Sequence, residues 1–197
     1  MGTSKPVIHL FLIFAVVGLL LSTVAGNIAE AAGDVMYTRY NLHVETQERV
    51  NGKPVYVTSY ANYIYPPSGL LLLPPNSRVV ILNNRKPYLI EVLDKNIRVN
   101  FEFHASRMGM DFEHYMKKIT SPKPVDLKGL TGLDRKGVTE GRAIKGMSKR
   151  GVMTALGFPA VHRTPSLDSN LWTYWKDRYR TFRVLFDSEG QVAEIID

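Results

Sequence analysis

The sequence contains no cysteine, and this absence constrains the fold more than any other feature of the composition. Without cysteine there is no disulfide scaffold, zinc finger, iron–sulfur cluster, c-type haem attachment or thiol nucleophile. The fold must therefore be stabilised by side-chain packing alone. With 197 residues, of which 45% are hydrophobic, the chain is long enough for one domain or two small ones, each burying an apolar core.

The N-terminal segment has the pattern of a secretory signal peptide. Lys5 is its only charged side chain, residues 10–21 are all apolar or glycine, and Ala25 ends a run with the small residues that a signal peptidase requires. We therefore predict a signal peptide over residues 1–25, export across the inner membrane and a periplasmic or envelope-associated location. An uncleaved N-terminal anchor is the alternative, because residues 7–26 are about long enough to cross a bilayer.

The formal net charge of +7 favours an acidic partner. The cations are spread along the chain, and no segment forms a polybasic tail. Together with the predicted export, this distribution argues against nucleic acid as the partner. Acidic protein surfaces and anionic lipid remain as candidate partners.

The first half of the mature chain has the pattern of an antiparallel β-structure. Stretches rich in β-branched and aromatic residues alternate with turn signals such as Asn51-Gly52. We expect strands within residues 36–44, 55–60, 78–82, 87–93 and 97–103. They predict a small antiparallel β-barrel or meander in a β-rich domain of residues 34–120. The segment LLLLPPNSRVVIL resembles the strand entry of bacterial SH3-like barrels, which implies cell-wall binding as one alternative function.

A short amphipathic helix is predicted at the end of this domain, over residues 110–119. Its apolar residues recur at helical spacing, and Asp111 is placed to cap it. These apolar residues are Phe112, Tyr115, Met116 and Ile119. The proline- and glycine-containing stretch 121–136 is expected to be a linker.

The C-terminal segment, residues 137–197, predicts two helices followed by three antiparallel strands. We expect one helix from a Thr139 cap through Lys145, and a second over residues 149–156 with Ser148 as its N-cap. Strands follow within residues 171–175, 182–186 and 192–196, the last two joined by a turn at 187–190. The expected fold class is therefore α+β, with an ααβββ two-layer sandwich after the β-rich domain.

The segments GMSKRGVMTALGFP, WTYW and FRVLFDSEGQV resemble the small outer-membrane-assembly lipoproteins of the BamE (SmpA, OmlA) family. The matching positions are Gly146, Met147, Ser148, Val152, Leu156, Gly157, Pro159, Trp172, Tyr174, Phe186, Asp187, Gly190 and Val192. The resemblance covers residues 137–197 and implies the ααβββ fold, an envelope location and a binding role without catalysis. Two features depart from that family: the lipidated cysteine is missing, and a β-rich domain precedes the module.

A binding surface is predicted where the first of these strands ends. Trp175 is expected to face away from Trp172 and Tyr174, and basic and aromatic residues follow it. Arginine beside aromatic residues is typical of binding surfaces, although a solvated sheet face is the simpler alternative. The candidate binding residues are Trp175, Lys176, Arg178, Tyr179, Arg180 and Arg183. Envelope or outer-membrane assembly proteins are the expected partners, with anionic lipid as a second.

No catalytic or cofactor motif is found, since GxSxG, HExxH, P-loop and dinucleotide patterns are all missing. The spacing of His104, Asp111, Glu113 and His114 matches no metal site. His162, Ser166 and Asp168 share one loop and do not have the arrangement of a triad. We expect no enzyme activity, metal or cofactor. The alternative is an enzyme of hydrolase type, or an inhibitor, with a site between the two halves that uses His104 and His114.

Overall fold

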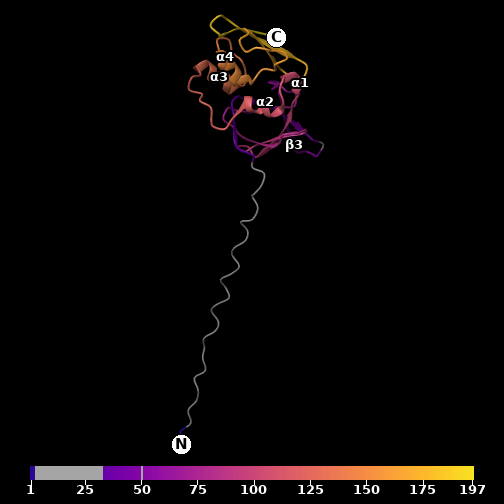
Figure 1. Cartoon of the computed structure of the whole chain (residues 1–197), viewed down its shortest axis with the longest axis vertical. Helices are drawn as coiled ribbons and strands as arrows, with labels where there is room; N and C mark the ends of the chain where they lie inside the picture. Colours follow the sequence, from indigo (N-terminus) through magenta and orange to yellow (C-terminus); the bar gives the residue numbers. More distant parts are fainter. Residues whose placement is uncertain (3–32, 50) are drawn as a thin grey trace. The chain divides into compact units, whose positions relative to one another are not determined.

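Two β-sheets and four helices form the part of the chain that the structure describes (Figure 1). This computed structural model describes residues 1–2, 33–49 and 51–197. The sequence-based prediction of a mixed α+β fold is confirmed. All but two residues of the predicted signal peptide lie outside the described residues. Ala32–Asp197 form one compact unit, and the following description concerns that unit.

The larger sheet has eight strands in the order β4-β2-β3-β7-β6-β5-β1-β8, and it curls around an apolar interior (Figure 1). Its strands are β1 (Met36–Thr38), β2 (Leu42–Glu48), β3 (Pro54–Ser59), β4 (Leu70–Leu73), β5 (Arg78–Asn83), β6 (Tyr88–Val92), β7 (Ile97–Glu102) and β8 (Thr120–Ser121). The five expected strand regions all contain strands, whereas β4 and β8 were not expected.

The pairing in this sheet differs from a simple antiparallel meander. β3 lies parallel to β7, with Tyr56 opposite Val99, while every other pair of described strands is antiparallel. β3 and β7 are separated by three other strands in the sequence, so their connection is a long crossover. Local alternation indicates where strands lie but carries no information on such distant pairing.

Helix α2 (Phe112–Ile119) fills part of the interior of the curled sheet, preceded by the single turn of α1 (Ala105–Met108). The Asp111 side chain caps α2 by accepting a hydrogen bond from the His114 N–H at 2.8 Å. The four apolar residues predicted to share one face of α2 are all at least 98% buried, which confirms that face. They pack with residues of the sheet such as Val44, Ile90 and Val99.

The second pair of helices is α3 (Gly132–Glu140) and α4 (Lys149–Leu156). The prediction for α4 is confirmed, including its Ser148 cap. The prediction of a helix from a Thr139 cap through Lys145 is wrong. α3 begins earlier, because Thr131 and Asp134 form a reciprocal capping box. It ends at Gly141, which has a φ of 64°.

The stretch 121–136, expected to be a linker, contains the first residues of α3 and one residue of β8. Within it, Leu130 is 96% buried. Val125 and Asn76 exchange two hydrogen bonds, of 2.7 and 3.1 Å, which attach this stretch to the turn before β5.

The smaller sheet is antiparallel in the order β11-β10-β9 and follows α4 in the sequence. Its strands are β9 (Leu171–Trp175), β10 (Thr181–Phe186) and β11 (Val192–Ile196). One face packs in a second apolar cluster with the buried face of α4, including Val152 and Leu156. The sheet side of this cluster consists of Trp172, Tyr174, Phe182, Val184, Phe186 and Val192.

Two buried asparagines connect the larger sheet to α3 and α4. The side-chain N–H₂ of Asn62 donates to the carbonyls of Leu156 (2.7 Å) and Asn41 (3.1 Å). The N–H₂ of Asn41 donates to the carbonyls of Val138 (2.7 Å) and Ala155 (3.1 Å). Three of these bonds go to carbonyls near the C-terminal ends of α3 and α4, where the last carbonyls of a helix need partners from outside it.

Candidate functional site

The turn between β9 and β10 is held in one conformation by Asp177. One carboxylate oxygen accepts hydrogen bonds from the N–H groups of Tyr179 and Arg180, both at 2.9 Å. The other oxygen pairs with the Arg180 guanidinium. The Tyr179 N–H bond, with the further bonds from Arg180, lowers the pKa of Asp177, so the carboxylate is ionised at neutral pH.

The tip of this turn presents one aromatic side chain between two arginines. Tyr179 is 87% exposed, the largest exposure of any aromatic side chain among the described residues. Arg178 pairs with Glu102 of β7 at 3.2 Å, so one arginine leans toward the larger sheet. We call Arg178, Tyr179 and Arg180 the hairpin tip.

Trp175, also expected on the binding surface, is 91% buried and packs in the core cluster of the larger sheet. It does face away from Trp172 and Tyr174, which belong to the other cluster. The imidazole of His162 lies over it with ring centroids 6.2 Å apart, and the Arg163 guanidinium lies 5.9 Å from its ring. Trp175 therefore connects the small sheet to the rest of the unit and is not available to a partner.

Lys176 and Arg183 lie apart from the hairpin tip. Lys176 has a side chain only 21% exposed, and its ammonium pairs with the Asp197 carboxylate at 2.7 Å. Arg183 is exposed on β10, on the face of the small sheet that also carries Trp175, as the pairing of Thr181 with Trp175 shows. The structure thus separates the six predicted residues into a buried tryptophan, a partly buried lysine, the hairpin tip and an exposed strand arginine.

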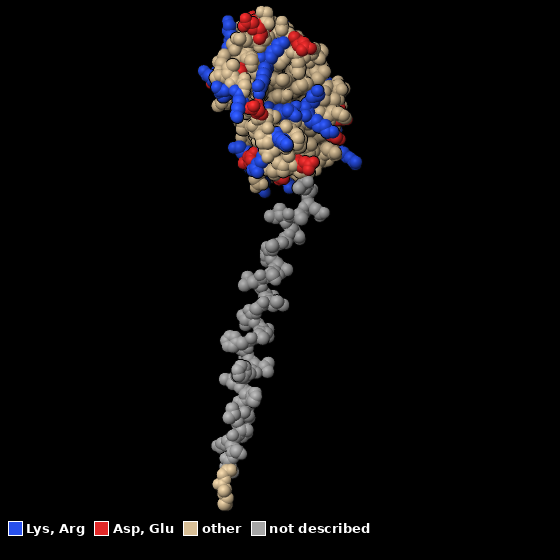
Figure 2. Space-filling model, turned by 60° about the vertical axis from the view of Figure 1, so that its left-hand side comes forward, with Lys and Arg blue, Asp and Glu red and all other residues tan. Residues whose placement is uncertain are grey.

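Basic groups near Trp175 were missed by the sequence analysis. Arg107 of α1 donates a 2.6 Å hydrogen bond to the hydroxyl of the buried Tyr60, and its carbonyl accepts from the His162 N–H. Burial lowers the pKa of His162, and the charges of Arg107 and Arg163 lower it further. Figure 2 shows several Lys and Arg side chains gathered across the middle of one face, with Asp and Glu side chains among and around them. No local sequence signal brings Arg107 and Arg163 together.

The histidines considered for catalysis have separate surroundings. His114 pairs with Asp111 at 2.8 Å on the exposed side of α2. His104 precedes α1 and meets the edge of the Tyr60 ring, with centroids 5.6 Å apart. Ser166 and Asp168 hydrogen bond to each other within one turn. Within residues 33–49 and 51–197, no group of three or more His, Asp or Glu side chains is arranged to hold a metal ion.

The most perturbed histidine is one that the sequence analysis did not single out. His43 of β2 is 98% buried, and its Nε2 lies 3.0 Å from the Gly141 carbonyl at the end of α3. Because a carbonyl only accepts, Nε2 carries the proton, which leaves Nδ1 buried as an acceptor without a partner among the described residues. Burial lowers the pKa of His43 to about 4, so the ring is neutral at pH 7.

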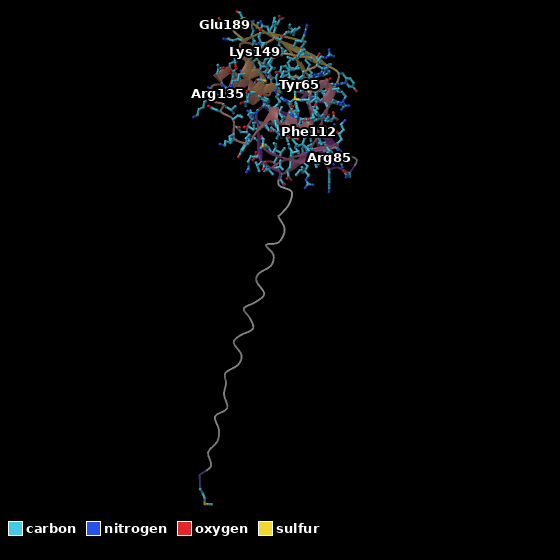
Figure 3. All side chains as sticks on the ribbon, in the orientation of Figure 1. Tyr65, Arg85, Phe112, Arg135, Lys149 and Glu189 are labelled. Carbon is cyan, nitrogen blue, oxygen red and sulfur yellow. The ribbon has the colours of Figure 1, made fainter. Side chains whose placement is uncertain are left out.

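A cavity of about 200 Å³ opens at the end of the small sheet. Ile64, Ala143 and Phe182 form an apolar floor, since each is at least 93% buried. The rim combines exposed apolar groups with charges: Tyr65, Arg142, Lys176, Ile195 and Asp197. In Figure 3, Tyr65 appears between Phe112 of the larger core and Glu189 of the β10–β11 turn.

The fold and these surfaces define a mixed α+β protein with a rigid, basic-aromatic hairpin and a separate amphipathic cavity. No family model, curated protein or solved structure matches the chain. No helix among the described residues is both long and apolar enough to cross a bilayer.

Proposed function

We propose that this protein is a non-enzymatic binding module of the bacterial cell envelope that docks to an acidic surface of an envelope or outer-membrane assembly protein. The hairpin tip is the observation that carries the proposal. An almost fully exposed tyrosine between two arginines has the composition of an interface hot spot.

The rigidity of the hairpin supports docking. Asp177 fixes the backbone of Tyr179 and Arg180 before any partner arrives, so little conformational entropy is lost on binding. Tyrosine adds a large contact area with few rotatable bonds. A partner that covered the exposed Tyr179 ring would remove its apolar area from water, which favours binding.

The envelope location and the resemblance to the BamE family are parts of the same proposal. They are supported by the signal-peptide pattern and by the motifs of residues 146–159 and 172–192. Two helices, α3 and α4, followed by a three-stranded antiparallel sheet support this part of the proposal, although α3 begins before residue 137. In this proposal the hairpin between β9 and β10 is the docking element of that module.

Site-specific photo-crosslinking in cells tests the proposal. A photoreactive phenylalanine analogue at position 179 is expected to form an adduct with one envelope protein. The same analogue at position 85, in the exposed turn between β5 and β6, is the matched control and gives no such adduct. Arg178→Glu is expected to weaken the adduct because it reverses a charge at the tip without removing the Asp177 bonds.

A vesicle-binding experiment distinguishes a protein partner from an anionic lipid partner. The full chain is mixed with vesicles of phosphatidylglycerol and phosphatidylcholine, and with vesicles of phosphatidylcholine alone. If the protein binds the anionic vesicles, loses this binding in Tyr179→Ala and forms no protein adduct at position 179, the protein-docking proposal is wrong. Labelling at positions 179 and 85 with equal yield would contradict it too.

A further inference from the structure

We propose that four exposed basic residues around Tyr60 and Trp175 form a binding site for a small dianion of the phosphomonoester type. We call His104, Arg107, His162 and Arg163 the basic cluster. The inference goes beyond docking at the hairpin tip, because it concerns other residues and a ligand of another class. It rests on three observations: the gathering of these groups around two buried rings, the lack of acidic partners among the described residues, and a fixed backbone beneath them.

Three members of the basic cluster surround the buried ring of Tyr60. The Arg107 guanidinium carbon lies 6.0 Å from the ring centroid, and its Nη1 donates a 2.6 Å hydrogen bond to the Tyr60 hydroxyl. The ring centroids of His104 and His162 lie 5.6 and 6.3 Å from that of Tyr60. Basic groups from two distant segments of the chain therefore meet around one aromatic ring.

Arg163 joins the cluster through Trp175. Its guanidinium carbon lies 5.9 Å from the indole, and the His162 ring lies 6.2 Å from the same indole. Backbone hydrogen bonds fix this segment: the His162 N–H donates to the Arg107 carbonyl at 3.0 Å, and the Arg163 N–H donates to the Ala160 carbonyl at 2.9 Å. The backbone that carries the cluster is thus in place before a ligand arrives, which lowers the entropic cost of binding.

The four side chains of the basic cluster are exposed and have no acidic partner among the described residues. Within residues 33–49 and 51–197, no ion pair joins any of them to a carboxylate. In the same part of the chain, the bond from Arg107 to Tyr60 is the one hydrogen bond that these side chains make. Other cations of the fold are each paired with a carboxylate, namely Arg78, Arg142, Lys176, Arg178 and Arg180.

The positive potential of this region also acts on His162. Burial lowers the pKa of its ring most, and the charges of Arg107 and Arg163 lower it further. The Nε1–H of Trp175, beneath the cluster, is buried without an acceptor among the described residues. The region therefore has an excess of positive charge and of hydrogen-bond donors, which an oxyanion complements.

The two arginines select the class of anion. Arg107 and Arg163 carry permanent charges, and the planar N–H groups of a guanidinium match the oxygens of a phosphate group. Two permanent charges balance the double negative charge of a phosphomonoester, whereas the phosphodiester of a lipid headgroup carries a single charge. His162 contributes an N–H donor in its neutral form and a further charge when it is protonated.

The first test is an NMR titration of the full chain with methyl phosphate and with dimethyl phosphate, at pH 7 and constant ionic strength. We expect methyl phosphate to shift the indole N–H signal of Trp175 and the imidazole signals of His162, with a Kd of about 1 mM. The indole signal of Trp172, which lies in the other apolar cluster, should not move. Dimethyl phosphate, with one charge, should bind about fivefold more weakly.

Arg163 is the position at which a variant leaves the core intact, because its side chain makes no hydrogen bond to a described residue. Arg163→Gln is expected to weaken methyl phosphate about fivefold, and Arg163→Lys, which keeps the charge, should restore part of the loss. Arg85→Gln, in the exposed turn between β5 and β6, is the matched control and leaves the affinity unchanged. Tyr179→Ala also leaves it unchanged, which separates this site from the hairpin tip.

Sulfate provides a second measurement, because it keeps both charges over the range in which histidine titrates. A bound dianion offsets the charges of Arg107 and Arg163. Sodium sulfate should therefore raise the pKa of His162 relative to sodium chloride of equal ionic strength. The rise should be smaller in Arg163→Gln.

Several results would overturn the proposal. Equal binding of methyl phosphate and acetate, or equal affinity in Arg163→Gln and the wild type, would show that the cluster is an ordinary solvated surface. An equal pKa of His162 in sulfate and in chloride would have the same meaning. If methyl and dimethyl phosphate bind equally, and phosphatidylglycerol vesicles bind the wild type but not Arg163→Gln, the cluster binds a lipid headgroup and not a phosphomonoester.

Discussion

At the scale of single residues, His43 makes the stability of the fold depend on pH. Its ordinary pKa of 6.5 falls to about 4 in the folded protein because burial disfavours the charged ring. Between pH 6.5 and about 4, the His43 ring is therefore protonated in the unfolded chain but neutral in the folded chain. The contribution of the neutral ring is fully present above pH 6.5 and is lost as the pH falls toward 4.

We expect the free energy of unfolding to fall by about 3 kcal/mol between pH 7 and pH 4 because of this residue. Urea denaturation across that range measures the effect. His43→Gln keeps a side-chain N–H that can reach the Gly141 carbonyl but has no group that titrates, so its pH dependence is expected to be smaller by that amount. His114→Gln, at an exposed position, is the control. An equal slope in wild type and His43→Gln would contradict the assignment.

Asp134 is the second buried ionisable group with a structural role. It is 1% exposed and accepts hydrogen bonds from the Thr131 N–H, the Ser148 N–H and the Ser148 hydroxyl, all within 3.0 Å. Burial would raise its pKa, but these bonds outweigh that effect and lower the pKa. The carboxylate joins the N-termini of α3 and α4, where a negative charge also suits both helix dipoles.

Asp134→Asn is therefore expected to lower the free energy of unfolding by about 1–3 kcal/mol, because the amide N–H₂ cannot accept these bonds. The stabilisation by the ionised carboxylate is present above the unfolded pKa of about 3.9 and is lost as the pH falls through the lower folded value. Urea denaturation at pH 7 measures the loss. Glu189→Gln, on an exposed turn, should change stability by less than about 0.5 kcal/mol.

At the scale of single elements, Asp177 is expected to determine the rigidity of the hairpin. Asp177→Ala removes the bonds to Tyr179 and Arg180, so the amides of residues 178–180 should exchange faster with solvent. Asp177→Asn keeps the accepting oxygen for the two backbone N–H groups and should restore most of the protection. Backbone amide exchange by NMR provides the measurement. Protection that is equal in all three proteins would show that the β9–β10 pairing alone fixes the turn.

Elements governed by local signals were predictable from the sequence. α4 has a serine cap, apolar residues one turn apart and a following Gly157, all within ten residues. The helix expected at 139–145 was wrong because Thr139, a reasonable cap, competes with the reciprocal pair Thr131 and Asp134. β4 was missed because its four leucines show no alternation, and it becomes a strand by pairing with β2.

The candidate site depended on tertiary contacts and was predicted only in part. The exposure of Tyr179 follows from its place in a short turn. The burial of Trp175 does not, because it results from residues 160–163 and Tyr60, which are distant in sequence. The amphipathic cavity likewise combines Ile64, Ala143 and Ile195 from three separate regions. Periodicity assigns a side chain to a face but does not show what covers that face.

At the scale of the whole unit, each of the two apolar clusters includes a residue from the part of the chain that mainly forms the other cluster. Trp175 of β9 packs in the cluster of the larger sheet, and Ile64, which precedes β4, packs in the cluster of the small sheet. The side-chain bonds of Asn41 and Asn62 to helix carbonyls cross the same boundary. Loss of one cluster would therefore leave buried polar groups of the other without partners.

This interlocking predicts that residues 34–120 and 137–197 unfold together, as one cooperative transition. The chain has two tryptophans, one in each cluster, so Trp175→Phe leaves Trp172 to report on the small sheet, and Trp172→Phe leaves Trp175 to report on the larger one. In each variant, the urea midpoint from tryptophan fluorescence should coincide with the midpoint from far-ultraviolet circular dichroism. Because both variants replace a buried side chain, fluorescence and dichroism are compared within each protein and not between proteins.

Asn62→Ala removes the bonds to Leu156 and Asn41, and it should lower both midpoints together by the equivalent of about 1–3 kcal/mol. If the fluorescence of one variant changes well before its dichroism, the two clusters fold as separate domains and the asparagine bonds do not couple them.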